Sequence, residues 1–226
     1  MAIRLDRRPG PKAVIFDLDE TLIDSRRAWE YALEEAVLAV TGRRIDSRPL
    51  AEHYRRRPWP DAVAIVVSGS TGQERVADLA AEMFTRSALK RLLVHEGIGM
   101  ALDVLRGDAI EVGAISRFPH RLALLQAQST GLDRFLAVLA ATPAGERFDQ
   151  ASRLDSCRAF LGYPPQQCAF VSGEAPSLIS AASAGYLVFE AAWATATRSG
   201  FPAVIHPGEL RNALASRREG APHRGV

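Results

Sequence analysis

Two carboxylates separated by one residue stand out near the start of the chain. Asp17 and Asp19 lie in the segment DLDETL (17–22), directly after the apolar run 13–16. Carboxylates that leave a buried strand are costly unless hydrogen bonds, an opposite charge or a metal ion compensates them. A calcium loop of the EF-hand type is disfavoured, because its later Asp and Gly positions are missing. The pattern therefore favours a catalytic pair of acids over a surface turn.

The elements around this loop follow an alternating order. The run 13–16 has the length and flanks of a buried strand in a parallel sheet. Strands followed by helices of similar length predict an α/β fold, a Rossmann-like parallel sheet with right-handed crossovers. Ligands bind such sheets at the carboxyl ends of their strands. Further strands are expected at 109–115, 135–140, 168–172 and 186–189, and helices at 118–130, 149–161, 176–184 and 207–216.

The stretch 25–95 differs from the rest, because its apolar residues recur at helical spacing and no convincing strand is visible. Helices are expected at 27–42, 60–67 and 73–92, with another at 96–106. The sequence thus predicts a small helical cap inserted after the first strand. The predicted domains are a core of 11–24 and 96–212, a cap of 25–95, and flexible termini at 1–10 and 217–226.

Composition narrows the class of protein. The 226 residues are 47% hydrophobic and 24% charged, as in ordinary globular proteins. No apolar run reaches the ~18 residues of a membrane span, and a net charge of +2 does not argue for nucleic acid. Cys157 and Cys168 form no CxxC pair, so a zinc site is not expected and a reducing cytoplasmic location is the default.

The segment VIFDLDETL (14–22) resembles the first motif of the haloacid dehalogenase-like hydrolases, a hydrophobic run followed by DxDxT. The resemblance extends over about 11–212, and the early helical insertion is similar to the cap of phosphoglycolate phosphatase and β-phosphoglucomutase relatives. It implies that Asp17 is a nucleophile forming an aspartyl-phosphate. It also implies that Asp19 is the general acid and base, and that Thr21 braces the loop. Relatives that dehalogenate lack the second Asp, so Asp19 indicates phosphoryl transfer.

The second motif of the family is a Ser or Thr at the end of the next core strand, where its hydroxyl binds phosphate. Ser116 follows the run VGAI and fits this position. The alternative is an ordinary turn residue. Arg117 comes next, where many relatives carry Asn. Its side chain either adds a phosphate contact or points to solvent.

The third motif is a Lys that offsets the charges of nucleophile and phosphate, but Lys12 and Lys90 are the only lysines in the chain. Uncompensated repulsion at ~4 Å is on the order of 4 kcal/mol per charge pair, about a thousandfold in rate. By its spacing, Arg147 is the first candidate to replace the Lys, and Arg153 is the second. Arginine is larger and forked, so the exchange is not neutral. The alternative is that Arg147 is an exposed loop residue.

The fourth motif supplies acids that hold Mg²⁺. Counting residues places the usual acids at Gly173 and Ser177, and shifting the gap by one makes Glu174 the metal carboxylate. The alternative is a solvated loop Glu. Mg²⁺ tolerates one or two protein carboxylates, so Asp17, the Asp19 carbonyl and Glu174 would suffice.

These observations predict a Mg²⁺-dependent phosphatase of a small phosphorylated metabolite, with no nucleic-acid or membrane partner. The absent Lys and acid support a second hypothesis, a degenerate relative that acts as a binding or regulatory module. Phosphomutase activity is a third option.

Overall fold

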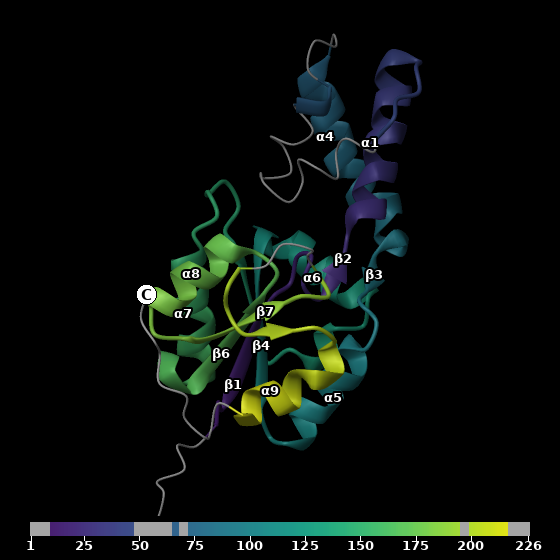
Figure 1. Cartoon of the computed structure of the whole chain (residues 1–226). Coiled ribbons are helices and arrows are strands. Elements are labelled where there is room, and N and C mark those ends of the chain that lie inside the picture. Colours follow the sequence, from purple (N-terminus) through teal and green to yellow (C-terminus); the bar gives the residue numbers. More distant parts are fainter. Residues whose placement is uncertain (1–9, 48–64, 68–71, 195–198, 217–226) are drawn as a thin grey trace, which may run out of the picture. The chain divides into compact units, whose positions relative to one another are not determined.

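The computed structural model describes residues 10–47, 65–67, 72–194 and 199–216. In this part of the chain, six strands form one parallel sheet in the order β5-β4-β1-β6-β7-β8 (Figure 1). The predicted fold class, an α/β Rossmann-like sheet, is therefore confirmed. The strands are β1 (Ala13–Asp17), β4 (Glu111–Pro119), β5 (Val138–Thr142), β6 (Cys168–Ser172), β7 (Leu187–Ala191) and β8 (Ala203–Val204).

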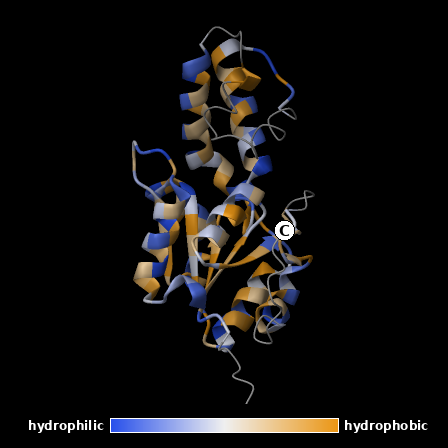
Figure 2. Ribbon diagram, turned by 60° about the vertical axis from the view of Figure 1, so that its left-hand side comes forward, coloured by the Kyte–Doolittle hydropathy of each residue, from blue (hydrophilic) through white to orange (hydrophobic). Residues whose placement is uncertain are grey.

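Strand β1 is a central strand of the sheet. Its first four residues are apolar, Asp17 ends it, and all five are buried. It pairs with β4 on one side, where Asp17 lies opposite Ile115, and with β6 on the other, where Phe16 lies opposite Val171. A strand covered on both faces reads as a continuous hydrophobic run. Figure 2 shows the strands as largely hydrophobic ribbons within this unit. The carboxyl ends of β4, β1 and β6 therefore lie next to one another.

Helices cover both faces of this sheet. Figure 1 shows α7 (Gln150–Leu161) and α8 (Ala175–Ser183) on one side, and α5 (Ile98–Gly107) with α9 (Leu210–Ser216) on the other. Asp149 caps α7, accepting a hydrogen bond from the amide of Ala151 at 3.1 Å. Short 3-10 turns lie at Asp133–Phe135, Pro165–Gln167 and Pro207–Glu209.

The chain divides into two compact units, and 23–93 with 121–133 make up the smaller one. The larger consists of 1–22, 94–120 and 134–226. The smaller contains α1 (Arg26–Thr41), α4 (Gln73–Met83), a π-helical turn Phe84–Ala88, a 3-10 turn Leu89–Arg91 and most of α6 (His120–Ser129). Its core includes the stacked rings of Trp29 and Phe84, whose centroids are 3.6 Å apart. The limits expected for the core (11–24 and 96–212) and for the cap (25–95) stay predictions.

Some elements differ from the sequence-based expectation. The helix expected at 73–92 consists of α4, the wider π-helical turn and the tighter 3-10 turn, one after the other. Strand β5 begins at Val138 rather than 135, because a 3-10 turn precedes it. A two-residue pairing of β2 (Ile23–Asp24) with β3 (Leu93–Val94) places a short strand where none was expected. Most of the helix expected at 60–67 lies outside the described residues.

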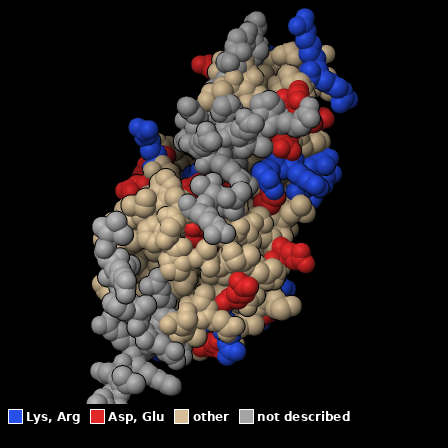
Figure 3. Space-filling view, viewed as in Figure 1, with Lys and Arg blue, Asp and Glu red and all other residues tan. Residues whose placement is uncertain are grey.

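Charged groups of both signs occur on the face drawn in Figure 3, as the small net charge implies. Among the described residues, no helix is long and apolar enough to cross a membrane.

Candidate active site

The loop predicted to carry the chemistry begins where β1 ends. Asp17 is the last residue of β1 and Asp19 lies in the turn that follows, and the two residues are only 3% and 4% exposed. The amide of Leu18 donates to the carbonyl of Ile115 at 2.9 Å, which holds the loop against β4. Both acids therefore lie at the carboxyl end of a central parallel strand, where such sheets bind their ligands.

Three other segments hold this loop in its turn. Glu20 has a φ of 65°, a left-handed conformation that is uncommon outside glycine. Its carbonyl oxygen lies 2.9 Å from Nε2 of His95, and Nε1 of Trp193 donates to the Thr21 carbonyl at 2.9 Å. The Thr21 hydroxyl accepts from the amide of Gly173 at 3.2 Å, so Thr21 ties the loop to the end of β6. His95 and Trp193 carry no sequence signal that would have linked them to the loop.

Asp19 is fixed through one of its two oxygens. Its Oδ2 accepts from the Ser116 hydroxyl at 2.8 Å and from the Arg117 amide at 3.0 Å. The Ser116 carbonyl in turn accepts from the Thr142 hydroxyl at 3.1 Å, which joins β4 to β5 at this point. Oδ1 of Asp19 is buried and has no hydrogen-bond partner within the described part of the chain. This arrangement suits a general acid, because one oxygen sets the orientation and the other is available to carry a proton.

Asp17 is supported from β6. The Ser172 hydroxyl lies 3.4 Å from Oδ2 of Asp17, a long hydrogen bond, and accepts from the Glu174 amide at 3.1 Å. Ser172 is fully buried, and the register of β1 with β6 places it beside Asp17. Sequence analysis assigned Ser172 to a strand but did not place it at the site. The signal was its position as the last residue of a predicted core strand.

Arg117 and Glu174 join the two strands on either side of β1. Nη2 of Arg117, which follows Ser116 in β4, donates to Oε1 of Glu174 at 2.5 Å. The other oxygen of Glu174 accepts from the Ser177 hydroxyl at 3.2 Å. The side chains are 18% and 30% exposed, so the pair is partly shielded from solvent. Because the strand order is β4-β1-β6, this ion pair spans the carboxyl end of β1.

Burial dominates the electrostatics of both aspartates. Burial raises the pKa of Asp17 well above its usual range, the Glu174 charge raises it further, and the Arg117 guanidinium opposes both effects. Burial also raises the pKa of Asp19, against the Arg117 charge and the Ser116 hydrogen bond. Arg117 is thus the strongest influence that stabilises the ionised form of either acid. The Arg117 charge only partly offsets the burial of the two acids, so the site favours a further cation or hydrogen-bond donor beside them.

Arg147 is not brought to these acids. It is exposed in the segment between β5 and α7, and no hydrogen bond or ion pair joins it to Asp17 or Asp19 among the described residues. Arg153 points back to β5, where Nη1 donates to the Ala141 carbonyl at 3.1 Å and Nη2 to the Ser152 hydroxyl at 2.8 Å. The structure therefore brings together Asp17, Asp19, Thr21, Ser116, Arg117 and Glu174, and leaves Arg147 outside.

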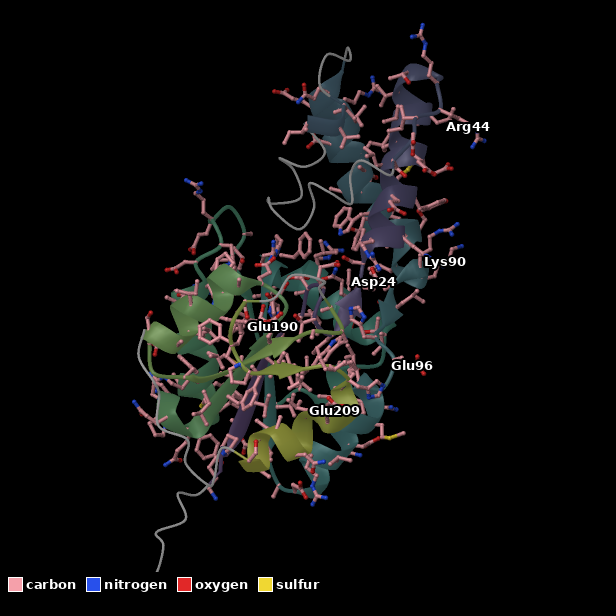
Figure 4. The ribbon with its side chains drawn as sticks, viewed as in Figure 1. Asp24, Arg44, Lys90, Glu96, Glu190 and Glu209 are labelled. Atoms are coloured by element: carbon pink, nitrogen blue, oxygen red, sulfur yellow. The ribbon has the colours of Figure 1, made fainter. Side chains whose placement is uncertain are left out.

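A further buried carboxylate lies at the end of β7. Glu190, labelled in Figure 4, is 1% exposed and accepts hydrogen bonds from the amide and hydroxyl of Ser199, the amide at 2.8 Å. These bonds fasten the segment after β7 to the sheet. We therefore assign Glu190 to structure rather than to catalysis.

The donor set suits a Mg²⁺ ion in part. The Asp17 carboxylate and the main-chain carbonyl of Asp19 are hard oxygen donors, and the pKa of each aspartate is raised by the Glu174 charge, as expected of acids that share one site. A carboxylate has about four lone-pair sites, so the bonds of Glu174 to Arg117 and Ser177 do not exhaust it. Among the described residues, no three His, Cys, Asp or Glu side chains are already gathered as a metal cluster.

This fold is similar to that of solved haloacid dehalogenase-like hydrolases. A haloacid dehalogenase-superfamily hydrolase (subfamily IA, variant 1) from Geobacter sulfurreducens PCA superposes with a TM-score of 0.74, at 17% identity, over 92% of this chain and 98% of that one. A haloacid dehalogenase-like hydrolase from Streptococcus pneumoniae gives 0.73, at 15% identity, over 90% and 98%.

A sequence relative gives the more particular likeness. A phosphoglycolate phosphatase from Chromobacterium violaceum is 27% identical over 188 residues, which cover 77% of this chain and 82% of that protein. No family model matches the chain. The sequence relative confirms the predicted resemblance, and the solved structures confirm the fold.

Proposed function

We propose that this protein is a phosphoric monoester hydrolase that acts on a small phosphorylated metabolite through an aspartyl-phosphate on Asp17. The observation that carries the proposal is the buried pair Asp17 and Asp19 at the end of β1, with Asp19 oriented by Ser116 and the Arg117 amide. The likeness to a phosphoglycolate phosphatase supports the same class of reaction. It also makes phosphorylated two- or three-carbon acids sensible first substrates to test.

The chemistry assigns one role to each acid. The ionised Asp17 attacks phosphorus, the bond from phosphorus to the leaving oxygen breaks, and Asp19 gives that oxygen its proton. Asp19 then takes a proton from water as the water oxygen attacks the phosphorus of the aspartyl-phosphate. The bond to Asp17 breaks and inorganic phosphate leaves. The free Oδ1 of Asp19 is the atom that holds the proton, because Oδ2 is engaged by β4.

Ser116 and Thr21 serve this reaction by position. The Ser116 hydroxyl fixes Asp19 at 2.8 Å, while Thr21 holds the loop to β6. Mg²⁺ would be held by the Asp17 carboxylate, the Asp19 carbonyl and Glu174, and when bound it would stabilise the charge that gathers on the phosphoryl oxygens. We also propose that the protein works in the cytoplasm.

The second candidate function is a binding or regulatory module without turnover. One observation favours it, because the carboxylate proposed for Mg²⁺ is held by Arg117. Such a module would bind phosphate without hydrolysing phosphate esters.

The test is a Mg²⁺-dependent assay on p-nitrophenyl phosphate and a panel of phosphorylated metabolites. We expect Asp17→Asn to fall to background, and Asp19→Asn to lose about 10² to 10⁴ in kcat. Asp133→Asn, a change of the same kind at an exposed position, should keep wild-type activity. Equal, background-level turnover by the wild type and Asp17→Asn would remove the enzyme hypothesis and leave the binding module.

A further inference from the structure

The site needs a cation, and no Lys of this chain supplies it from the position of the third motif. Lys12 lies just before β1 and Lys90 lies in the 3-10 turn of the smaller unit, and the chain has no other Lys. A phosphoryl group brought to Asp17 repels this carboxylate, and repulsion of that kind slows attack unless a positive charge offsets it. A cationic side chain close to both aspartates is therefore the group to look for.

Arg117 is held at that place by both its backbone and its side chain. Its amide donates to Oδ2 of Asp19 at 3.0 Å, and its guanidinium reaches Oε1 of Glu174 on the far side of β1. Arg117 lies two residues beyond Ile115, the partner of Asp17 in β4, and Glu174 lies two residues beyond the end of β6. The ion pair therefore reaches from one neighbour of the central strand to the other, beyond the end of that strand. That strand is β1, which ends at Asp17.

The two arginines that the motif spacing favoured are differently placed. Arg147 is exposed and makes no contact with the acids among the described residues. Arg153 uses both of its terminal nitrogens on Ala141 and Ser152, which holds it to β5 and the start of α7. Neither acts on the aspartates as Arg117 does.

We propose that Arg117 is the catalytic cation of this enzyme, which offsets the charge between Asp17 and the phosphoryl group, and that Glu174 is its positioning residue. The inference rests on the proposed function. A guanidinium offers five N–H donors in a planar fork, so it can keep one bond to Glu174 and present others to phosphoryl oxygens. Its bonds to phosphate are charge-assisted and directional.

Glu174 is well suited to hold the guanidinium in place. Its carboxylate accepts from the Ser177 hydroxyl at 3.2 Å, and its amide donates to the buried Ser172 hydroxyl at 3.1 Å. Ser172 in turn contacts Asp17. The residue that anchors Arg117 is thus connected to the nucleophile through a single side chain.

The first experiment separates binding from turnover. Inorganic phosphate binding is measured by calorimetry in the Asp17→Asn background, where the repelling carboxylate is absent and no turnover occurs. Adding Arg117→Met should weaken phosphate binding at least tenfold, and Arg117→Lys should restore part of the loss. Arg147→Met is the matched control and should change phosphate binding less than twofold. Unchanged binding in Arg117→Met, or an equal loss in Arg147→Met, would overturn the proposal.

The second experiment uses steady-state kinetics in the otherwise wild-type chain at saturating Mg²⁺. Arg117→Met should lower kcat about a hundredfold or more, because its charge matters most in the transition state, and KM should change less. Phosphate binding without Mg²⁺, in the Asp17→Asn background, tests Glu174: if it acts through Arg117, adding Glu174→Gln to Arg117→Met should weaken that binding no further. Additive losses would remove the positioning role from Glu174.

The two hypotheses fail in different ways. A wild type that turns over no ester, while Arg117→Met still weakens phosphate binding, would reject the proposed function and retain Arg117 as the anion-binding group. A wild type that turns over esters with Arg117→Met unimpaired would reject the inference alone. Circular dichroism on each variant is the control that the fold is kept.

Discussion

At the scale of single residues, burying the two aspartates lowers the stability of the fold. Asp17 and Asp19 are almost completely buried, and burial raises the pKa of each. A buried carboxylate without full compensation lowers stability, and one unit of raised pKa corresponds to about 1.4 kcal/mol. Buried carboxylates with raised pKa values, each oriented by hydrogen bonds, are typical of catalytic sites and do not stabilise the fold.

The raised pKa of Asp17 predicts how stability depends on pH in the absence of metal. Its unfolded pKa is about 3.9, and between this value and the higher folded pKa the folded state binds more protons. The free energy of unfolding therefore falls as pH rises through this window. Asn cannot ionise, so Asp17→Asn should be more stable than the wild type at neutral pH. Below the unfolded pKa the two proteins should be similar.

Urea denaturation with EDTA, at about pH 4 and at neutral pH, measures this difference. Asp133→Asn is the control and should follow the wild type at both values, because Asp133 is exposed. An Asp17→Asn protein that is less stable than the wild type at neutral pH would show that the carboxylate stabilises the fold instead.

The two cysteines give a separate prediction at this scale. Burial raises the pKa of Cys157 to about 12 and that of Cys168 to about 11, and neither side chain is exposed. The thiolate is the reactive form, so both thiols should be inert to a disulfide reagent in the native protein at neutral pH. Both should react when guanidinium chloride unfolds the chain. Rapid labelling of one thiol before unfolding would contradict the burial of the pair.

Sequence reasoning found the residues whose chemistry is marked by local context. Asp17, Asp19, Thr21 and Ser116 follow apolar runs, and the structure brings them together. The direction of Arg117 could not be read, because whether its side chain points to solvent or crosses β1 depends on the strand order. Arg147 was favoured by spacing alone, and spacing does not say on which side of a loop a residue lies.

At the scale of elements, apolar runs located the core strands well. Strand β6 (Cys168–Ser172) has the predicted bounds, and β1 differs from prediction only by including Asp17. Strand β4 was predicted at 109–115 but spans Glu111–Pro119, because the polar residues after 115 gave no strand pattern. The strand β8 was missed, because two residues are too short to form a pattern. The break in the helix after Met83 was missed as well, since a single π-helical or 3-10 turn is too short to change the apolar spacing of a long helical pattern.

Strand β4 offers a test of how tightly α7 packs on the sheet. A Cβ at Gly113 would lie 2.5 Å from Sγ of Cys157 and 3.1 Å from Cγ1 of Val138. We expect Gly113→Ala to lower the free energy of unfolding by about 1 to 3 kcal/mol, because the extra methyl group overpacks the core. Gly99→Ala in α5 is the control, since nothing lies within 4 Å of its added Cβ and alanine favours helices. Denaturant titration measures the free energy of unfolding of each variant. Equal values would show that α7 shifts away from β4 at little cost.

At the scale of the whole molecule, each of the two compact units has its own packed interior. The larger unit is built on buried strands, with Ile15, Ile115 and Phe170 in its core cluster. The smaller is built on α1 and the helical segment from α4 onward, where Trp29 stacks on Phe84 with both rings almost fully buried. The insertion was predicted from its helical spacing, whereas this aromatic contact joins residues too distant in sequence for any local pattern to reveal.

Separate interiors predict that damage to one unit is felt mainly within it. Trp29→Ala removes the largest fully buried side chain among the described residues of the smaller unit and should lower its stability by about 3 to 5 kcal/mol. Hydrogen exchange should then quicken in α1 and α4, while the amides of β1, β4 and β6 keep their protection, because local opening follows cooperative units. Phe160→Ala, at a side chain that is 70% exposed, is the control and should change stability by no more than about 0.5 kcal/mol. If Trp29→Ala instead quickened exchange equally in the sheet, the two units would have to unfold as one, and loop substitutions at the catalytic site would then alter the stability of both.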